Sequence, residues 1–228
     1  MSLFETHYLK AQEFFDEGNY EAARVALKHA LESNPPANDC RAHALLGLTY
    51  RKLELDNDAL EMFEYCIPRT PTADVFAELS LILAEQDVES DRAVELANHA
   101  IQTDPDLASA YLALFLVYSR QNEYITALKH LKSGLRRGAE YSEQRVFDLV
   151  RGWCQMYCDE RCFEKAFQII HEIADFYHSF DFLVLKARIA DLSNRPRVSV
   201  EYYKKALSFV RTGPMRTDIL EAIAKNAI

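Results

Sequence analysis

Apolar side chains recur at helical spacing through most of the chain. A small residue is followed four positions later by a larger apolar one at Ala23 and Leu27, and again at Ala59 and Phe63. Residues four apart share one face of a helix, so each pair predicts a packed helical turn. No segment alternates polar and apolar residues as a strand does. The pattern predicts an all-α chain, with helices over residues 4–17, 20–33, 39–53, 56–67, 73–86, 90–103, 107–120, 123–137, 142–159, 163–177, 180–193, 196–211 and 215–228.

One phrase of sequence is repeated along the chain. Its three clearest copies are GNYEAARVALKHALESNP (18–35), LDNDALEMFEYCIPRTP (55–71) and ESDRAVELANHAIQTDP (89–105). The copies end in Pro35, Pro71 and Pro105, which are 36 and 34 residues apart. A repeat of this length, built from helix-forming residues, is typical of a solenoid in which helix pairs stack on one another.

The second copy carries the most complete form of the phrase. Its residues are Leu46, Gly47, Tyr50, Ala59, Phe63 and Pro71. They resemble the tetratricopeptide repeat family, whose pattern is W-x₂-L-G-x₂-Y, then A-x₃-F, then P. The resemblance implies a right-handed superhelical α-solenoid of about six repeats, forming a single domain over residues 1–228. We place the repeats at 4–37, 38–72, 73–106, 107–140, 142–178 and 180–211, followed by a capping helix at 215–228. In that last helix we expect Ile219, Leu220, Ile223 and Ala227 to face inward.

In two repeats, the first helix contains a segment that is apolar on nearly all sides. These segments are LSLILA (79–84) and YLALFLVY (111–118). In the resembled family, one strip of each first helix lines a concave groove, which would be apolar in the early repeats. The candidate groove residues are Tyr8, Ala44, Leu48, Arg51, Val75, Glu78, Ile82, Glu85, Leu112 and Leu116. The corresponding positions of the later repeats are more charged: Asp148, Arg151, Gln155, Cys158, Asp181, Val184, Arg188 and Asp191. The alternative is that the apolar residues of the early helices form core and not groove.

Charge and cysteine content narrow the function class and the compartment. The chain has 26 basic and 35 acidic side chains, a net charge of −9, which disfavours nucleic acid as the partner. Five cysteines form no disulfide scaffold, and the first residues lack the apolar core of a signal peptide. No run is long enough to span a membrane. We therefore expect a cytoplasmic protein.

Three cysteines lie four residues apart, at Cys154, Cys158 and Cys162. The first two share a helix face, but the third lies beyond the predicted turn, and a structural zinc needs four converging ligands. Buried cysteine usually packs as a small apolar side chain, so we expect these three to pack and to bind no metal. The chain also lacks a phosphate-binding glycine loop and a G-x-S-x-G motif. The sequence predicts no cofactor and no enzyme activity.

The resemblance implies a protein–protein interaction scaffold or adaptor, chaperone-like in the sense that it holds an apolar peptide or helix of a partner in its groove. A structural subunit that self-associates, or that builds a secretion or pilus-type complex, is an alternative. A recognition domain of a longer protein is another.

Overall fold

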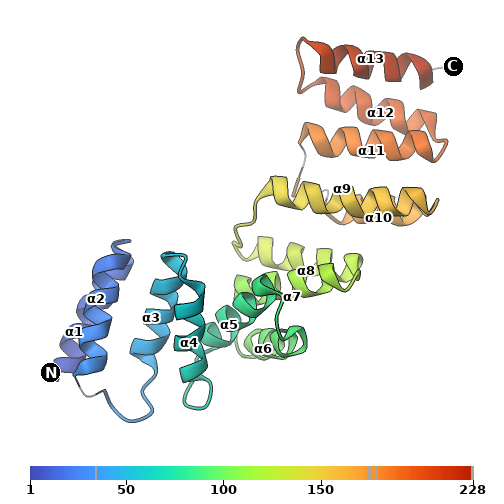
Figure 1. Ribbon diagram of the computed structural model, residues 1–228. Coiled ribbons are helices and arrows are strands. Elements are labelled where there is room, and N and C mark those ends of the chain that lie inside the picture. Colours follow the sequence, from blue (N-terminus) through green and yellow to red (C-terminus); the bar gives the residue numbers. More distant parts are fainter. Residues whose placement is uncertain (34, 174–175, 178, 227–228) are drawn as a thin grey trace. The chain divides into compact units, whose positions relative to one another are not determined.

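The computed structural model describes residues 1–33, 35–173, 176–177 and 179–226 (Figure 1). In these residues the chain forms thirteen α-helices and no strand. The helices are α1 (Leu3–Asp16), α2 (Tyr20–Glu32), α3 (Arg41–Lys52), α4 (Asp56–Cys66), α5 (Ala73–Gln86), α6 (Ser90–Thr103), α7 (Ala108–Arg120), α8 (Tyr124–Arg136), α9 (Glu143–Asp159), α10 (Phe163–Ile173), α11 (Phe180–Leu192), α12 (Pro196–Leu207) and α13 (Pro214–Asn226). The all-α prediction is confirmed.

The turn inside a helix pair has a common backbone form. Two residues after the end of the first helix, the chain adopts a positive φ in five of the pairs, at Gly18, Glu54, Asn122, Arg161 and Asn194. This left-handed conformation ends a helix and reverses the chain, and glycine adopts it without strain. The sequence pattern does not show this shared turn, because only one of the five positions is glycine.

Helices of a pair approach closely where the repeat has its smallest residue. At Gly47 in α3, an added Cβ would lie 2.6 Å from Cε1 of Phe63, whose ring in α4 is fully buried. The contact between the two helices therefore favours glycine at this position. The motif Leu46-Gly47 and the Ala59–Phe63 step thus describe the two sides of one interface.

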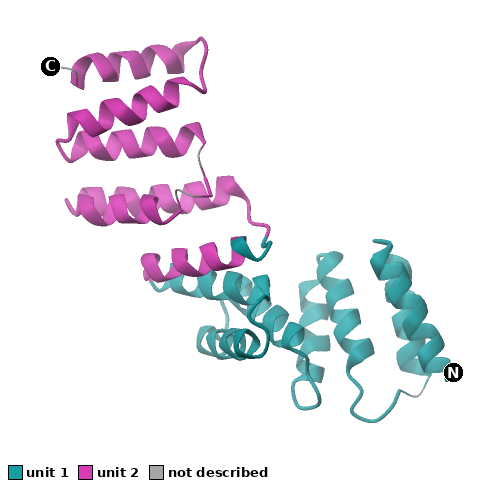
Figure 2. Cartoon of the chain, turned by 180° about the vertical axis from the view of Figure 1, so that it is seen from behind, with its two compact units in different colours: residues 1–121, 136–139 teal, residues 122–135, 140–228 magenta. Residues whose placement is uncertain are grey.

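The chain divides into two compact units, shown in Figure 2. Unit 1 comprises residues 1–121 and 136–139, and unit 2 comprises residues 122–135 and 140–228. Unit 1 contains α1 to α7, in which α1 pairs with α2, α3 with α4, and α5 with α6. Unit 2 contains most of α8 and all of α9 to α13, in which α9 pairs with α10 and α11 with α12. The single solenoid domain over residues 1–228 stays a prediction.

The last helix lies against the end of unit 2, and its role as a cap stays a prediction. α13 packs on α12, and Ile219 is buried against Ala187, Tyr203 and Ala206. Asn226 donates a hydrogen bond of 2.8 Å to Asp191 and so ties the end of α13 to α11. The sequence had also predicted that Leu220 faces inward. This is wrong, since Leu220 is 45% exposed. Ala227, expected to face inward too, lies outside the described residues.

Candidate functional site

The early apolar residues predicted to line a groove are mostly buried. Val75 and Ile82 on α5 are 1% and 0% exposed, and Leu112 on α7 is 9% exposed. The reason is that α5 is in contact with α4, α6 and α7, so that every residue from 79 to 84 lies in the core. The predicted open strip through Leu48, Ile82, Leu112 and Leu116 is therefore interrupted, and for Val75, Ile82 and Leu112 the structure follows the core alternative.

The remaining predicted groove residues of unit 1 reach the surface. They are the partly buried Tyr8, Ala44, Leu48, Arg51, Glu78 and Leu116, together with the exposed Glu85. Whether a partner contacts these residues stays a prediction.

The charged members of this set are already paired with one another. The Arg51 guanidinium lies 2.6 Å from Asp56, 3.0 Å from Glu85 and 3.6 Å from Glu78. Burial opposes the charge on Arg51, but the neighbouring carboxylates outweigh it and the pKa of Arg51 is raised. Burial raises the pKa of Glu78 as well. These side chains are satisfied inside unit 1, so they hold α3, α4 and α5 together before any partner binds.

A hollow among the described residues of unit 2 is formed by the helices α9, α11 and α13. It has a volume of about 390 Å³, which is within the range of ligand-binding sites, and it is lined by α9, α11 and α13. Its lining includes Phe147, Arg151, Cys154, Gln155, Cys158, Asp181, Val184, Arg188, Ile189, Leu192, Met215, Asp218 and Ile219. We call this hollow the unit 2 cavity. Six of the eight positions named for the late groove line it, and Asp148 and Asp191 do not.

The walls of the unit 2 cavity are apolar and partly accessible. Leu192 and Met215 are 59% and 60% exposed, and Val184 and Phe147 are partly buried. The Phe147 ring is held edge-on against the buried Phe182, with 5.2 Å between ring centroids. Apolar side chains of this size are usually covered in a soluble protein, so this surface has the character of a contact site.

The rim of the unit 2 cavity carries charges of both signs. Arg151 pairs with Asp148 at 3.0 Å and lies over the Phe147 ring, 5.6 Å from its centroid. Arg188, Asp181 and Asp218 complete the charged lining. Arginines beside an apolar wall can orient the polar groups of a bound chain, while the wall takes its apolar side chains.

The two late-groove residues that do not line the cavity, Asp148 and Asp191, form hydrogen bonds within the protein. Asp148 is bonded to Arg151, and Asp191 accepts hydrogen bonds from Tyr203 and Asn226. Sequence reasoning missed the contribution of α13, whose Met215 and Asp218 lie four and one residues before the buried Ile219. The signal was the helical spacing of α13, which continues the series of first helices beyond the last repeat.

Comparison with known proteins agrees with the repeat pattern. Residues 4–36 match the family model described as tetratricopeptide repeat. The structure of pilF from Pseudomonas aeruginosa has the same fold, with a TM-score of 0.57, 20% identity, and coverage of 96% of this chain and 97% of that one. The chain thus carries a tetratricopeptide repeat at residues 4–36 and has the fold of solved tetratricopeptide repeat structures. No curated protein sequence matches it.

Two further solved structures have the same fold as this chain. The type IV pilus biogenesis factor PilW is 16% identical, with a TM-score of 0.56 over 96% of this chain and 99% of that one. YrrB, described as a protein of this class with an unusual peptide-binding site, is 15% identical, with a TM-score of 0.54 over 87% of this chain and 90% of that one. At such identities the likeness concerns the fold alone.

Two of the three cysteines of the fifth repeat, Cys154 and Cys162, contact backbone carbonyls. Cys154 donates to the carbonyl of Ala166 at 3.6 Å, and Cys162 donates to the carbonyl of Glu160 at 3.7 Å. Burial raises the pKa of Cys154 to about 12, and burial also raises the pKa of Cys158. Within the described ranges, no three His, Cys, Asp or Glu side chains are grouped to hold a metal ion, and no helix is long and apolar enough to cross a membrane.

Proposed function

We propose that this tetratricopeptide repeat protein is a non-catalytic scaffold that binds a short segment of a partner protein in the unit 2 cavity. The observation that carries the proposal is the combination of an open hollow of about 390 Å³ with accessible apolar walls on α9, α11 and α13. The partner segment is a peptide or helix with at least one large apolar side chain. The likeness to YrrB supports the proposal at the level of the fold.

The energetics favour such an occupant over a small polar ligand. Leu192 and Met215 together with Val184 offer apolar surface that a partner side chain would remove from water. Each large apolar side chain buried in full contributes about 1.5–3 kcal/mol. The rim charges on Arg151, Arg188 and Asp218 then select the polar groups on either side of that anchor.

The chemistry of the cavity lining supports a role without catalysis. The thiols of Cys154 and Cys158 are nucleophilic groups in its lining, and burial raises the pKa of both. A thiol with a raised pKa carries little thiolate at neutral pH and is a poor nucleophile. The odd number of unpaired cysteines in the sequence supports the cytoplasm as the compartment. Fractionation of cells that produce the natural protein tests this last point.

Selection of peptides on the full chain tests the proposal. A library of random peptides displayed on phage is selected against the purified protein, and the binders are measured by calorimetry. We expect peptides with an apolar anchor, and we expect Leu192→Glu to weaken them by at least about tenfold, equivalent to about 1.4 kcal/mol. Leu192 is 59% exposed, so the substitution leaves the fold intact.

A matched control is available in the same unit. Phe209 is 56% exposed and lies outside the cavity lining, so Phe209→Glu makes the same kind of change on another surface. We expect it to leave the affinity unchanged. The proposal is refuted if the peptides bind Leu192→Glu as tightly as the unsubstituted protein. It is also refuted if Phe209→Glu weakens their affinity as much as Leu192→Glu does, because the binding surface would then lie elsewhere.

An assembly subunit of a pilus-type complex is the second candidate function. It is supported by the likeness in fold to pilF and PilW over nearly the whole length of each chain. The match covers 96% of this chain in both cases, 97% of pilF and 99% of PilW. A subunit that stacks end to end gives particles that grow with concentration, whereas a peptide-binding scaffold stays small. Light scattering over a range of protein concentrations separates the two, and growth that Leu192→Glu does not alter would favour the assembly role.

A further inference from the structure

Two cysteines of the second helix pair are in mutual contact. Cys40 lies directly before α3, and Cys66 is the last residue of α4. The Cys40 sulfur lies 3.9 Å from the carbonyl oxygen of Cys66, and the Cys66 sulfur lies 3.7 Å from the carbonyl oxygen of Cys40. Each thiol is therefore directed at the other residue. A disulfide joins two cysteines whose side chains converge, and here the sulfur of each cysteine contacts the backbone carbonyl of the other.

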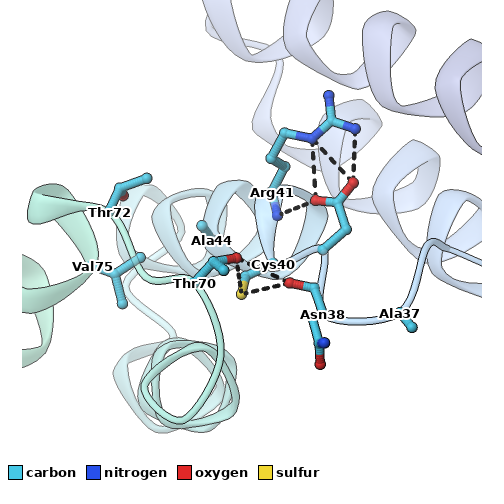
Figure 3. A pocket seen from close by; sticks show the side chains of 9 residues that line it. Ala37, Asn38, Cys40, Arg41, Ala44, Thr70, Thr72 and Val75 are labelled. Atoms are coloured by element: carbon cyan, nitrogen blue, oxygen red, sulfur yellow. Dashed lines mark hydrogen bonds and ion pairs between the residues drawn. The ribbon is translucent and has the colours of Figure 1, made fainter.

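A pocket of unit 1 borders one of the two cysteines, Cys40, which is 4% exposed. It has a volume of about 380 Å³ and is lined by Cys40, Asn38, Thr70, Ala44 and Val75, among others. Figure 3 shows the Cys40 sulfur between the backbone of Asn38 and the hydroxyl of Thr70. Cys66 is fully buried and is not part of the lining. A small reagent in the pocket thus meets Cys40 before Cys66.

We infer that Cys40 and Cys66 are a dithiol modification site, which a small-molecule disulfide such as oxidised glutathione converts to an intramolecular disulfide through this pocket. The Cys40 thiolate attacks one glutathione sulfur, so that a mixed disulfide forms and one glutathione leaves as its thiolate. Cys66, after losing its proton, then attacks the Cys40 sulfur and releases the second glutathione. The two protein thiols lose two electrons and two protons, and one oxidised glutathione becomes two reduced ones.

The order and speed of the steps follow from the positions of the thiols. Burial raises the pKa of Cys66 to about 12, which keeps it largely protonated and makes the second step the slower one. The mixed disulfide at Cys40 therefore accumulates before the internal disulfide. The product links the start of α3 to the end of α4 across 26 residues. Such a link restricts the unfolded chain and raises the melting temperature of the protein.

The test uses the full chain with oxidised glutathione under native conditions. Samples taken over time are quenched with acid, their free thiols are alkylated, and the digest is analysed by mass spectrometry. We expect a glutathione adduct on Cys40, then a peptide pair linked through Cys40 and Cys66, reversed by dithiothreitol. Cys154 and Cys158 provide the internal comparison, because β-carbons one helical turn apart are about 5–6 Å apart, beyond the reach of a disulfide.

Single variants distinguish this route from unspecific oxidation. Cys66→Ala should stop at the adduct on Cys40, and Cys40→Ala should leave Cys66 unmodified. Ala44→Leu, which adds a side chain at the pocket lining, should slow the first adduct several-fold. Circular dichroism shows that each variant is folded. The inference is overturned if neither thiol reacts in the native unsubstituted chain, if its Cys40 adduct never proceeds to Cys66, or if Cys66 reacts equally well in Cys40→Ala.

Discussion

Replacing Gly47 by alanine tests the closest approach in unit 1. The new Cβ would lie 2.6, 2.8 and 2.9 Å from three ring atoms of Phe63, whereas ordinary contact begins at 3.4 Å. The Phe63 ring is fully buried and must move into packed surroundings. Overpacking of this kind costs about 1–3 kcal/mol. Alanine has a higher helix propensity than glycine, which offsets about 1 kcal/mol of this cost. We therefore expect a net loss of stability of about 1 kcal/mol.

Gly152 provides the matched control, since it also lies inside a helix. An added Cβ there has no neighbouring atom within 4 Å. Gly152→Ala should therefore show the helix propensity gain alone, about 1 kcal/mol of added stability. The difference between the two substitutions isolates the clash with Phe63.

Urea unfolding measures both substitutions. Circular dichroism at the helical band follows the whole chain, and the fluorescence of Trp153, the single tryptophan, follows unit 2. A second change, Phe63→Leu, should be tolerated better in the Gly47→Ala background than alone, because the smaller side chain leaves room for the methyl group. Stabilisation by Gly47→Ala equal to that of Gly152→Ala would show that the ring moves freely, and would refute the reasoning.

Three further predictions concern stability. Ile219→Ala should lower the free energy of unfolding by about 2–4 kcal/mol, measured by urea titration of unit 2 fluorescence, because Ile219 is the buried anchor of the capping helix. Gly18→Ala should cost about 1–2 kcal/mol in thermal unfolding, since its φ of 75° is strained for alanine although space is free. The hydrogen bond from Arg41 lowers the pKa of Asp39, whose stabilisation is complete above the ordinary value of 3.8 and lost as the pH falls through the lower folded-state pKa. Asp39→Asn should therefore reduce the dependence of the free energy of unfolding on pH at the acid end of the range.

The sequence determined the helices and, within each unit, how they pair. Helix positions depend on local spacing of apolar residues and on turn residues, and the predicted ranges agree with the structure for α5 and α6 without change. Differences occur at helix ends, where tertiary contacts compete with local preference. The helix predicted over 196–211 ends at Leu207, because Ser208 and Phe209 bond back three residues and tighten the last turn.

Only the tertiary structure decided which apolar surfaces are open. A helix that is apolar on all sides, such as α5, has the same sequence pattern in two cases. One of its faces can line a groove, or all of its faces can pack against other helices. Contacts with α4, α6 and α7 bury Ile82, while Leu192 and Met215, ordinary apolar residues at the end of α11 and the start of α13, stay accessible. The contact of Cys40 with Cys66 is likewise absent from the sequence pattern. Exposure depends on neighbours distant in the chain, and local spacing carries no information about them.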